Sequence, residues 1–280
     1  MKKPLLTLLL LTISVLLSAP ASACPAIDQL PDFNCDAKIR IVVLGDSLVS
    51  GVGDTKNNNT GGYVFRTQNR FLNAQVDNFG VAGLNTVQLL LKIQRAFDGR
   101  GNVRLAAALV QADLVILDLG RNDRWFFGEP LQTSRRLKKS VDLIQRRVTT
   151  LAEYPPLIVT AVLMLPNRGS QGPWVKDLNQ LILKSHSKEK PADLRFDLVS
   201  KRLLSDDQIH PTPAGYNALS LVLRDYLLKS FPKHAAAMRL DQDDDLLYDI
   251  FERSKFGTDP QLRDTDGDGL IDGNDPTPAG

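Results

Sequence analysis

The chain has 280 residues, of which 43% are hydrophobic, and its formal net charge is +2. This length and composition suit one medium-sized α/β domain with a small extra module, and they exclude a chain too polar to bury a core. The charge is divided unevenly, because residues 241–280 hold twelve Asp or Glu against three Lys or Arg. We therefore expect an acidic C-terminal part that differs chemically from the rest of the chain.

The first residues have the three regions of a secretory signal peptide. Lys2 and Lys3 precede an apolar run at residues 5–17, and small residues follow at 21–23. The apolar run is too short to span a bilayer comfortably. We therefore predict that residues 1–23 are a signal peptide, that the protein is exported to the periplasm or the extracellular space, and that nucleic acid is not a partner.

The two cysteines of the chain, Cys24 and Cys35, lie just after the predicted cleavage site. Because an exported protein meets an oxidising compartment, a local disulfide between them is the first expectation. The alternative is a lipoprotein anchor on Cys24. Residues 21–24 loosely resemble a lipobox, although Ala21 stands where that motif prefers leucine.

Five short apolar runs alternate with longer stretches of helical character. The expected strands are Ile39–Leu44, Val76–Phe79, Asp113–Leu119, Leu157–Leu163 and Phe196–Val199. This alternation is typical of a parallel sheet covered by helices on both faces, so we predict a doubly wound α/β domain. In such sheets the loops after the carboxyl ends of the strands form the active crevice, and chemistry is sought there.

Much of the positive charge lies between Arg121 and Arg147, in a stretch with helical periodicity. The apolar residues that recur at helical spacing are Leu137, Val141, Ile144, Val148 and Leu151. We interpret the basic side chains as a solvated helix face. The alternative is a binding patch for anionic lipid or polysaccharide.

The first expected strand runs directly into Gly45-Asp46-Ser47-Leu48, which places a serine at a strand end. A serine hydroxyl needs a base to take its proton, and an imidazole base needs a carboxylate to hold its tautomer. Asp207 and His210 offer this pair, because they lie three residues apart, just before the helix-start signal Thr212-Pro213. We predict a triad of Ser47, Asp207 and His210, with an ordinary turn and a structural histidine as the alternatives.

The other histidines, His186 and His234, have no carboxylate at such a spacing, and we expect both at the surface. Acyl transfer also needs donors for the oxyanion of the tetrahedral intermediate. Gly83 follows the second strand and precedes an expected helix at Thr86–Phe97, so its N–H can face the crevice. Asn122 follows the third strand and can supply a side-chain amide. Each segment, taken alone, also suits a simple turn.

In chain order these segments resemble the conserved blocks of the GDSL, or SGNH, hydrolase family. The matching segments are Gly45–Leu48, Gly83, Gly120–Asp123 and Asp207–His210. The resemblance covers about residues 38–230, and we place the hydrolase domain at 36–232. It implies a flavodoxin-like three-layer α/β/α fold, the SGNH hydrolase fold.

The same resemblance implies cleavage of carboxylic esters or thioesters through an acyl-enzyme on Ser47, with no cofactor for catalysis. It implies an oxyanion hole formed by the N–H groups of Ser47 and Gly83 and by Asn122. Family members act on small-molecule, lipid and acylated-sugar esters, so the substrate stays open. An O-acyl transferase with a sugar acceptor is the alternative enzyme. Trp125-Phe126-Phe127 could line an acyl pocket or belong to the core.

The acidic tail at 240–280 contains two loops with the ligand spacing of calcium sites. The second loop offers Asp264, Asp266, Asp268, Asp272 and Asp275, with Gly269 at the turn, and the first offers Asp241, Asp243, Asp245, Asp249 and Glu252. In the first loop Leu246 replaces the turn glycine. The pair resembles bacterial thrombospondin type 3-like repeats, which implies structural Ca²⁺; a disordered acidic tail is the alternative.

A tail of this kind allows another class of function for the whole chain. It could associate with the cell surface or envelope, and the chain could then be a calcium-dependent surface-binding protein with an inactive hydrolase domain. The presence of Ser47, Gly83, Asn122 and His210 argues against that alternative.

Overall fold

The computed structural model describes residues 26–34, 36–57, 61–152, 155–164, 166, 170–186, 190–199, 201–238, 240–249 and 252–280. The predicted signal peptide at 1–23 and both cysteines, Cys24 and Cys35, lie outside the described residues. In the described part of the chain, each helix is too short or too polar to cross a bilayer.

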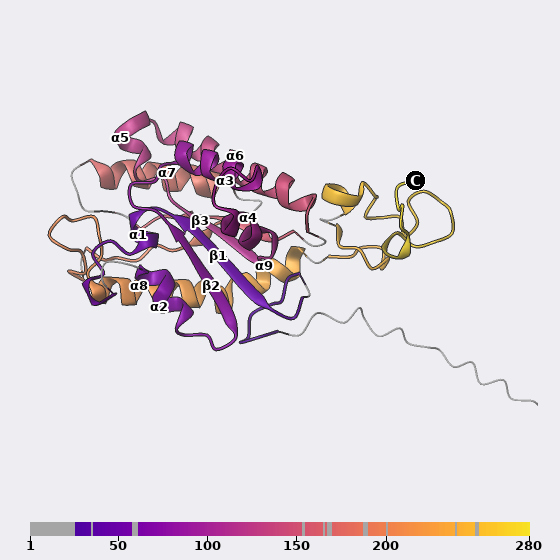
Figure 1. The fold of residues 1–280 in the computed structure, drawn as a ribbon, viewed down its shortest axis with the longest axis horizontal. Helices are drawn as coiled ribbons and strands as arrows, with labels where there is room; N and C mark the ends of the chain where they lie inside the picture. The colour runs from indigo at the N-terminus through magenta and orange to yellow at the C-terminus, as the bar shows by residue number, and fades with distance from the viewer. Residues whose placement is uncertain are drawn as a thin grey trace, which may run out of the picture.

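Within these residues, five parallel strands form one sheet in the order β2-β1-β3-β4-β5 (Figure 1). They are β1 (Ile39–Gly45), β2 (Ala74–Gly80), β3 (Leu114–Asp118), β4 (Leu157–Val162) and β5 (Ala192–Asp193). Every residue of β3 and β4 is buried. This is expected of parallel strands that are covered on both faces.

Helices cover both faces of the sheet, so the predicted three-layer α/β/α fold is confirmed (Figure 1). One layer contains α3 (Thr86–Phe97), α4 (Val103–Val110), α6 (Pro130–Thr149) and α7 (Gln171–Ser185). The other contains α1 (Ser47–Ser50), α2 (Gly62–Gln68), α8 (Pro213–Lys229) and α9 (Phe231–Met238). Short elements complete the list: α5 (Asp123–Phe127), η1 (Thr55–Asn57), η2 (Glu252–Phe256) and η3 (Asp272–Asn274).

Local capping explains where two helices beside the site begin. Asn85 and Gln88 form a reciprocal capping box at the start of α3, which spans the predicted residues. At α8, the Thr212 side chain accepts the Gly215 N–H, and Pro213 occupies the first turn. Both helices were predicted from the sequence, and the start of α8 was predicted from its Thr212-Pro213 signal, which is local.

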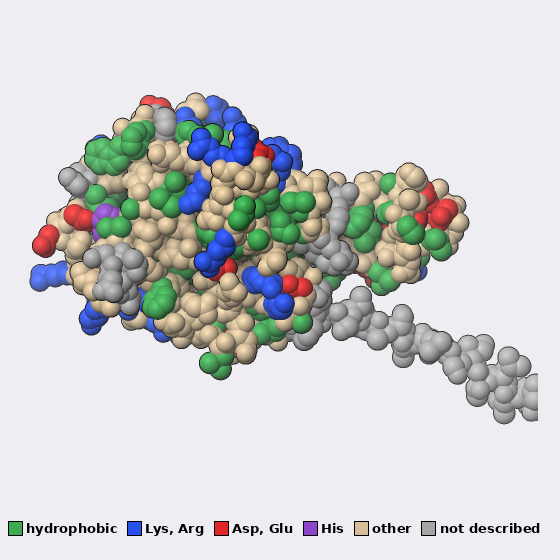
Figure 2. Space-filling view, viewed as in Figure 1, with side chains coloured by type: hydrophobic (Ala, Val, Ile, Leu, Met, Phe, Trp, Pro, Cys, Tyr) green, Lys and Arg blue, Asp and Glu red, His purple; other side chains and the backbone are tan. Residues whose placement is uncertain are grey.

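The basic stretch forms α6, an amphipathic helix. Leu137, Val141, Ile144 and Val148 are buried, as their spacing predicts, but Leu151 is 62% exposed, because α6 ends at Thr149. The expectation that Leu151 continues the apolar face is wrong for that reason. Lys and Arg side chains gather over this part of the surface, as a solvated helix face requires (Figure 2).

The predicted fifth strand at Phe196–Val199 is wrong. The edge strand β5 lies earlier, at Ala192–Asp193, and pairs with the end of β4. At 196–199 the backbone turns instead, with Leu198 N–H donating to the Phe196 carbonyl. Apolar composition could not separate a short buried turn from a short strand.

The acidic tail lies at the end of the sheet opposite α1 (Figure 1). Leu247 is buried, and Tyr248 and Phe256 pack against the hydrophobic core. Phe231, at the start of α9, is also buried. The domain limits at 36–232 and 240–280 stay predictions.

Candidate active site

Ser47 is the first residue of α1, and only Asp46 separates it from the end of β1. Asp46 caps this short helix, because its Oδ1 accepts the Leu48 N–H at 3.0 Å. A Cβ on Gly45 would lie 2.1 Å from Val49 Cγ2 and 2.5 Å from the Asp118 carbonyl oxygen, so only glycine permits this approach of β1, α1 and β3. The tight turn leaves Ser47 half-buried at the carboxyl edge of the sheet.

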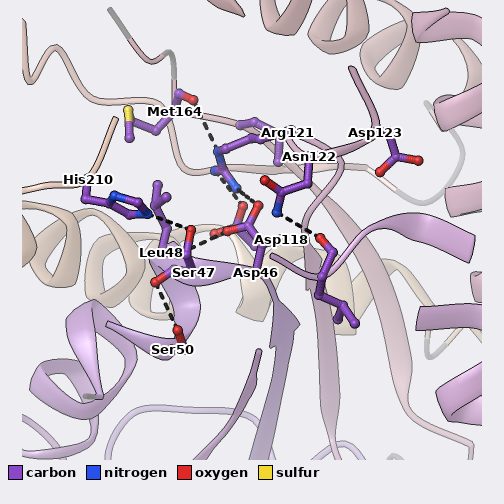
Figure 3. Close-up of polar contacts among 12 residues, drawn as sticks. Asp46, Ser47, Leu48, Ser50, Asp118, Arg121, Asn122, Asp123, Met164 and His210 are labelled. Atoms are coloured by element: carbon purple, nitrogen blue, oxygen red, sulfur yellow. Dashed lines mark hydrogen bonds and ion pairs between the residues drawn. The ribbon is translucent and has the colours of Figure 1, made fainter. Parts of the chain in front are cut away.

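Ser47, His210 and Asp207 meet in hydrogen-bonding order, although Ser47 and His210 are 163 residues apart in sequence. His210 Nε2 lies 2.8 Å from Ser47 Oγ (Figure 3). On the other side of the ring, His210 Nδ1 lies 2.5 Å from Asp207 Oδ2. Both contacts are satisfied when Nδ1 carries the proton and Nε2 accepts from the serine hydroxyl. This arrangement is the one that a general-base serine site requires.

Asp207 is held as an ionised acceptor. Its Oδ1 accepts the backbone N–H groups of Ile209 and His210, each at 2.9 Å, and the Ser205 hydroxyl lies 2.9 Å from the same oxygen. Burial raises the pKa of Asp207, but the bonds from His210, Ile209 and Ser205 outweigh it and hold this pKa well below its usual range. The carboxylate is therefore negative wherever the protein is folded near neutral pH.

The loop that carries the pair is closed by backbone hydrogen bonds. Ser205 N–H donates to the His210 carbonyl at 2.8 Å, and Thr212 N–H donates to the Leu203 carbonyl at 2.8 Å. Gln208 adopts a φ of 59° between Asp207 and His210. The closed loop leads straight into α8, which fixes the direction of the imidazole.

The two other predicted donor segments flank this edge of the sheet. Gly83 is exposed with a φ of 76°, and among the described residues no atom beyond its two chain neighbours lies within 4 Å of the position a Cβ would take. Asn122 Nδ2 donates to the Leu84 carbonyl at 3.0 Å. An amide nitrogen carries two hydrogens, so this bond orients Asn122 and leaves one hydrogen to donate.

Asp123 connects these two segments, a role that the sequence analysis did not assign. It is fully buried, accepts the Thr86 N–H at 3.0 Å, and also accepts the Thr86 hydroxyl. Burial raises the pKa of Asp123, and the bonds from Thr86 oppose that rise. Asp123, the residue after Asn122, thus ties the segment that carries Asn122 to the start of α3, next to Gly83.

A buried ionic network that the sequence analysis missed lies beneath Ser47. Arg121, only 2% exposed, binds Asp46 and Asp118 (Figure 3). The Tyr63 hydroxyl donates to Asp118 at 2.5 Å. Burial raises the pKa of Asp46, and Arg121 opposes that shift. The signal available in the sequence was a charged residue, Arg121, at a buried strand end, which could not be told from a surface arginine.

The expectation of a surface position is wrong for His186. It is 1% exposed, with Nδ1 at 3.2 Å from Thr160 Oγ1 and Nε2 at 3.3 Å from the Ser134 carbonyl. Contacts from β4 and α6 satisfy the ring in the core, which a charged local sequence did not reveal. His234 is partly buried beside Tyr226, with 5.9 Å between the ring centroids.

The aromatic residues after Asn122 are not all in the core. Trp125 and Phe126 on α5 are 57% and 63% exposed, which excludes the core alternative for these two. Arg124 stacks on Trp125, with its Cζ 4.8 Å from the ring centroid. Exposed aromatic side chains therefore begin three positions along the sequence from Asn122, the candidate oxyanion donor.

The acidic tail gathers its carboxylates into three groups, and within each group one oxygen per residue lies within 4.8 Å of the others. The groups are Asp241, Asp243 and Asp245; Asp264, Asp266 and Asp268; and Asp245, Glu252 and Asp272. The third group joins the two predicted loops. Asp249 and Asp275, also predicted as ligands, belong to none of these groups; Asp249 instead accepts the Gln242 N–H at 3.0 Å.

The group that joins the loops is buried. Asp245 and Glu252 are fully buried and Asp272 is 2% exposed, while Asp245 Oδ2 and Glu252 Oε2 have no hydrogen-bond partner within the described part of the chain. Burial, with repulsion between the carboxylates, raises the pKa of Asp245 to about 6 and that of Glu252 to about 7. Buried unpaired carboxylate oxygens are the hard ligands that Ca²⁺ prefers.

The departure at Leu246 has a structural consequence. Leu246 takes a φ of 83°, close to the 97° of Gly269 at the matching position of the second loop. The first loop therefore has the turn that the second has, at the cost of a leucine in the left-handed region.

Comparison with known proteins agrees with this fold. The model of the GDSL-like lipase/acylhydrolase family matches residues 43–218, more than half of the chain. The chain belongs to the GDSL-like lipase/acylhydrolase family. It is an ester-hydrolysing enzyme, and the family places its substrates among small-molecule esters and lipids. Comparison with curated proteins gave no match.

Solved structures share the fold at low sequence identity. A lipolytic protein of the G-D-S-L family from Veillonella parvula DSM 2008 aligns with a TM-score of 0.55 at 16% identity, over 68% of this chain and 99% of its own. The lipase Lip_vut3 from a goat rumen metagenome gives 0.54 at 19% identity, over 69% and 100%. The esterase EstA from Pseudoalteromonas sp. gives 0.52 at 15%, over 69% and 98%.

Proposed function

We propose that the chain is an exported serine ester hydrolase that cleaves carboxylic esters or thioesters through an acyl-enzyme on Ser47. The observation that carries the proposal is the relay of Ser47 Oγ, His210 and Asp207, with contacts of 2.8 and 2.5 Å. These distances lie within or just below the usual range for such bonds. The loop closure around His210 supports the same assignment.

In this mechanism Ser47 Oγ attacks the ester carbonyl while His210 Nε2 takes the hydroxyl proton. The tetrahedral intermediate collapses, and the leaving alcohol or thiol departs with that proton, which leaves an acyl group on Ser47. Water then attacks the acyl-enzyme with His210 as base, and the acid product leaves. Asp207 stays ionised and stabilises the imidazolium in both halves.

The oxyanion is bound by the backbone N–H groups of Ser47 and Gly83 and by Asn122 Nδ2. The open position of Gly83 and the anchoring of Asn122 on the Leu84 carbonyl support this hole. Donors held in place before the reaction stabilise developing charge without reorganisation.

Replacing Asn122 with alanine is expected to lower kcat about 100- to 1,000-fold, because one preorganised oxyanion donor is lost. The measurement is steady-state hydrolysis of a p-nitrophenyl ester. Asn217→Ala on α8 is the matched control, because its amide oxygen contacts Arg70 away from the site, and kcat should stay within twofold. A loss below tenfold for Asn122→Ala would make that residue structural.

Trp125 and Phe126 support an acyl group of some length, because their side chains are exposed and they follow Asn122 by only three and four residues. Hydrolysis of p-nitrophenyl esters of graded chain length should therefore favour medium over acetyl chains. Trp125→Ala should flatten that preference while leaving acetyl-ester turnover within about twofold. Acylated sugars as substrates, and transfer to a sugar acceptor in place of water, are tested by product analysis with and without acceptor alcohols.

Export, to the periplasm or the extracellular space, rests on the sequence of residues 1–23. We propose cleavage before Cys24 and a disulfide between Cys24 and Cys35, with lipidation of Cys24 as the alternative. Intact mass of the protein purified from its native host separates the two, because a disulfide lowers the mass by two hydrogens and an acyl anchor raises it by several hundred daltons.

We also propose that the tail binds structural Ca²⁺, with no metal needed for catalysis. The three carboxylate groups would hold the ions, and Asp245, Glu252 and Asp272 would tie one loop to the other. A cation removes the repulsion between carboxylates and stabilises only the ordered tail. Association with the cell surface or envelope through this tail is the wider proposal.

Chelation is therefore expected to expose residues 241–280 to proteolysis without abolishing ester hydrolysis. Modules of this kind bind Ca²⁺ at roughly 10⁻⁴ to 10⁻³ M. At 100 times the Kd, the ion stabilises the folded tail by about 2.7 kcal/mol. The measurement is limited proteolysis and ester turnover with 10 mM Ca²⁺ or EDTA.

Glu252→Gln should abolish the calcium protection, whereas Asp259→Asn, an exposed carboxylate outside the three groups, should keep it. If EDTA eliminated hydrolysis at once while the tail stayed resistant, the structural role would be wrong and a metal would belong in the active site.

A fluorophosphonate probe tests the proposed function most directly. The related esterase EstA is described as inhibited by monoethylphosphonate, which supports phosphonate chemistry as the probe. Peptide mapping should place the label on Ser47. A calcium-dependent binding protein with an inactive hydrolase domain would show no label.

A further inference from the structure

Arg121 joins three strand ends beneath Ser47. Its Nη1 donates to Asp46 Oδ2 at 3.1 Å, its Nη2 to Asp118 Oδ1 at 2.8 Å, and its Nε to the Met164 carbonyl at 3.5 Å. Asp46 follows β1, Asp118 ends β3, and Met164 follows β4. The guanidinium therefore clamps the carboxyl edge of three neighbouring strands at the place where the site is built.

The Arg121–Asp46 contact affects the position of the nucleophile Ser47. The two carboxylate oxygens of Asp46 have different partners. Oδ2 accepts from Arg121, and Oδ1 accepts the Leu48 N–H at 3.0 Å. That second bond caps α1 and sets the direction of the Ser47 N–H and hydroxyl. A movement of Asp46 would therefore turn Ser47 as well.

The anchored Arg121 also affects the position of Asn122, because Asn122 is the next residue in the chain. Anchoring of the Arg121 side chain fixes the backbone from which the Asn122 amide extends toward Leu84 (Figure 3). Arg121 and both carboxylates are at most 2% exposed, so solvent weakens these bonds little.

We propose that Arg121 is a positioning residue that sets Asn122 relative to Ser47, so that both can donate to one oxyanion. The inference rests on the proposed roles of Ser47 and Asn122. An arginine suits this task because its planar fork reaches two carboxylates at once, whereas a lysine ammonium is a point charge on a flexible stem. A displacement of about 1 Å of such a donor lowers rates on the order of 100-fold.

A double-mutant cycle on kcat separates positioning from a purely structural role. Arg121→Lys keeps a buried cation, and we expect it to lower kcat 10- to 100-fold with KM within threefold, for p-nitrophenyl ester hydrolysis per phosphonate-titrated site. In the Asn122→Ala background, the same change should lower kcat less than threefold. The donor that Arg121 sets is already gone there, and Asp46 still caps α1.

Tyr63→Phe is the matched control, since it removes one bond to Asp118 from the far side of the network without touching either donor. It should lower Tm while kcat stays within twofold. Asp46→Asn repeats the cycle if Arg121→Lys does not fold, because the amide oxygen can still cap α1 while the ionic bond to Arg121 is lost.

The inference is overturned if folded Arg121→Lys keeps its kcat, because Arg121 would then act on stability alone. It is also overturned if the substitution lowers kcat by the same factor in both backgrounds, because Arg121 would then not act through Asn122. Failure of the proposed function looks different. In that case the phosphonate would not label Ser47 in the wild-type enzyme.

Discussion

Ser47→Ala is expected to lower kcat about a million-fold while leaving the fold intact. Residues of a serine triad act as a unit, so removing the nucleophile removes nearly all the rate enhancement above the residual contribution of the oxyanion hole and binding. Ser47 is half-buried, and its hydroxyl hydrogen bonds to His210, so alanine leaves only a small void. The measurement is kcat of the purified variant, with Tm to verify folding.

Ser50→Ala is the control for this prediction. Ser50 lies in the same short helix, and its hydroxyl donates to the Ser47 carbonyl at 3.1 Å, so the variant alters α1 without removing a triad group. Its kcat should fall less than tenfold. Substantial turnover in purified Ser47→Ala would show that the assignment of Ser47 as the nucleophile is wrong.

Asp207→Asn is expected to lower kcat about 10,000-fold with little change in structure. The asparagine amide can donate to His210 Nδ1, which would place the imidazole proton on Nε2 and prevent it from accepting the Ser47 proton. Because the pKa of Asp207 lies below its usual range, the wild-type carboxylate is ionised across the working range and its protonation does not limit the rate. The measurement is kcat from pH 5 to 9.

Asp206→Asn is the matched control, since it removes the same charge from the neighbouring exposed position. Its kcat should stay within twofold. A loss of less than tenfold for Asp207→Asn would mean that another group orients His210.

The hydrogen bonds that Asp207 accepts also predict the sign of the effect of acid on the free energy of unfolding. A carboxyl whose folded pKa is lowered stabilises the folded state above its unfolded pKa, and that contribution is lost as pH falls toward the folded pKa. Asp207 is 41% exposed on its side chain, so this contribution is small.

Local signals in the sequence located the candidate triad. Gly45 permits the close turn before Ser47, and Thr212-Pro213 begins α8 directly after His210. The predicted strands end in polar residues, and this indicated that the carboxyl edge of the sheet would carry the triad. Turns and caps depend on a few neighbouring residues, so they can be predicted without knowing the rest of the fold.

Burial was harder to predict, because it depends on partners from elsewhere in the chain. His186 has a charged local sequence, yet its ring is buried in the core, where its nitrogens contact Thr160 and Ser134. Residues 196–199 have a strand-like composition, yet the backbone turns and the edge strand forms at Ala192–Asp193. In both places tertiary contacts decided the outcome against the local signal.

The sequence by itself determined the fold class, the order of the family segments and the residue types that a serine hydrolase needs, since each is set by local preference or by periodicity. Only the tertiary structure decided which charges are buried together. Arg121 meets Asp46 across 75 residues, and Asp272 joins Asp245 and Glu252 from the other loop of the tail. Such groupings depend on how strands and loops pack. Packing gives the Arg121 cation two carboxylate partners, whereas in the tail it buries three carboxylates together.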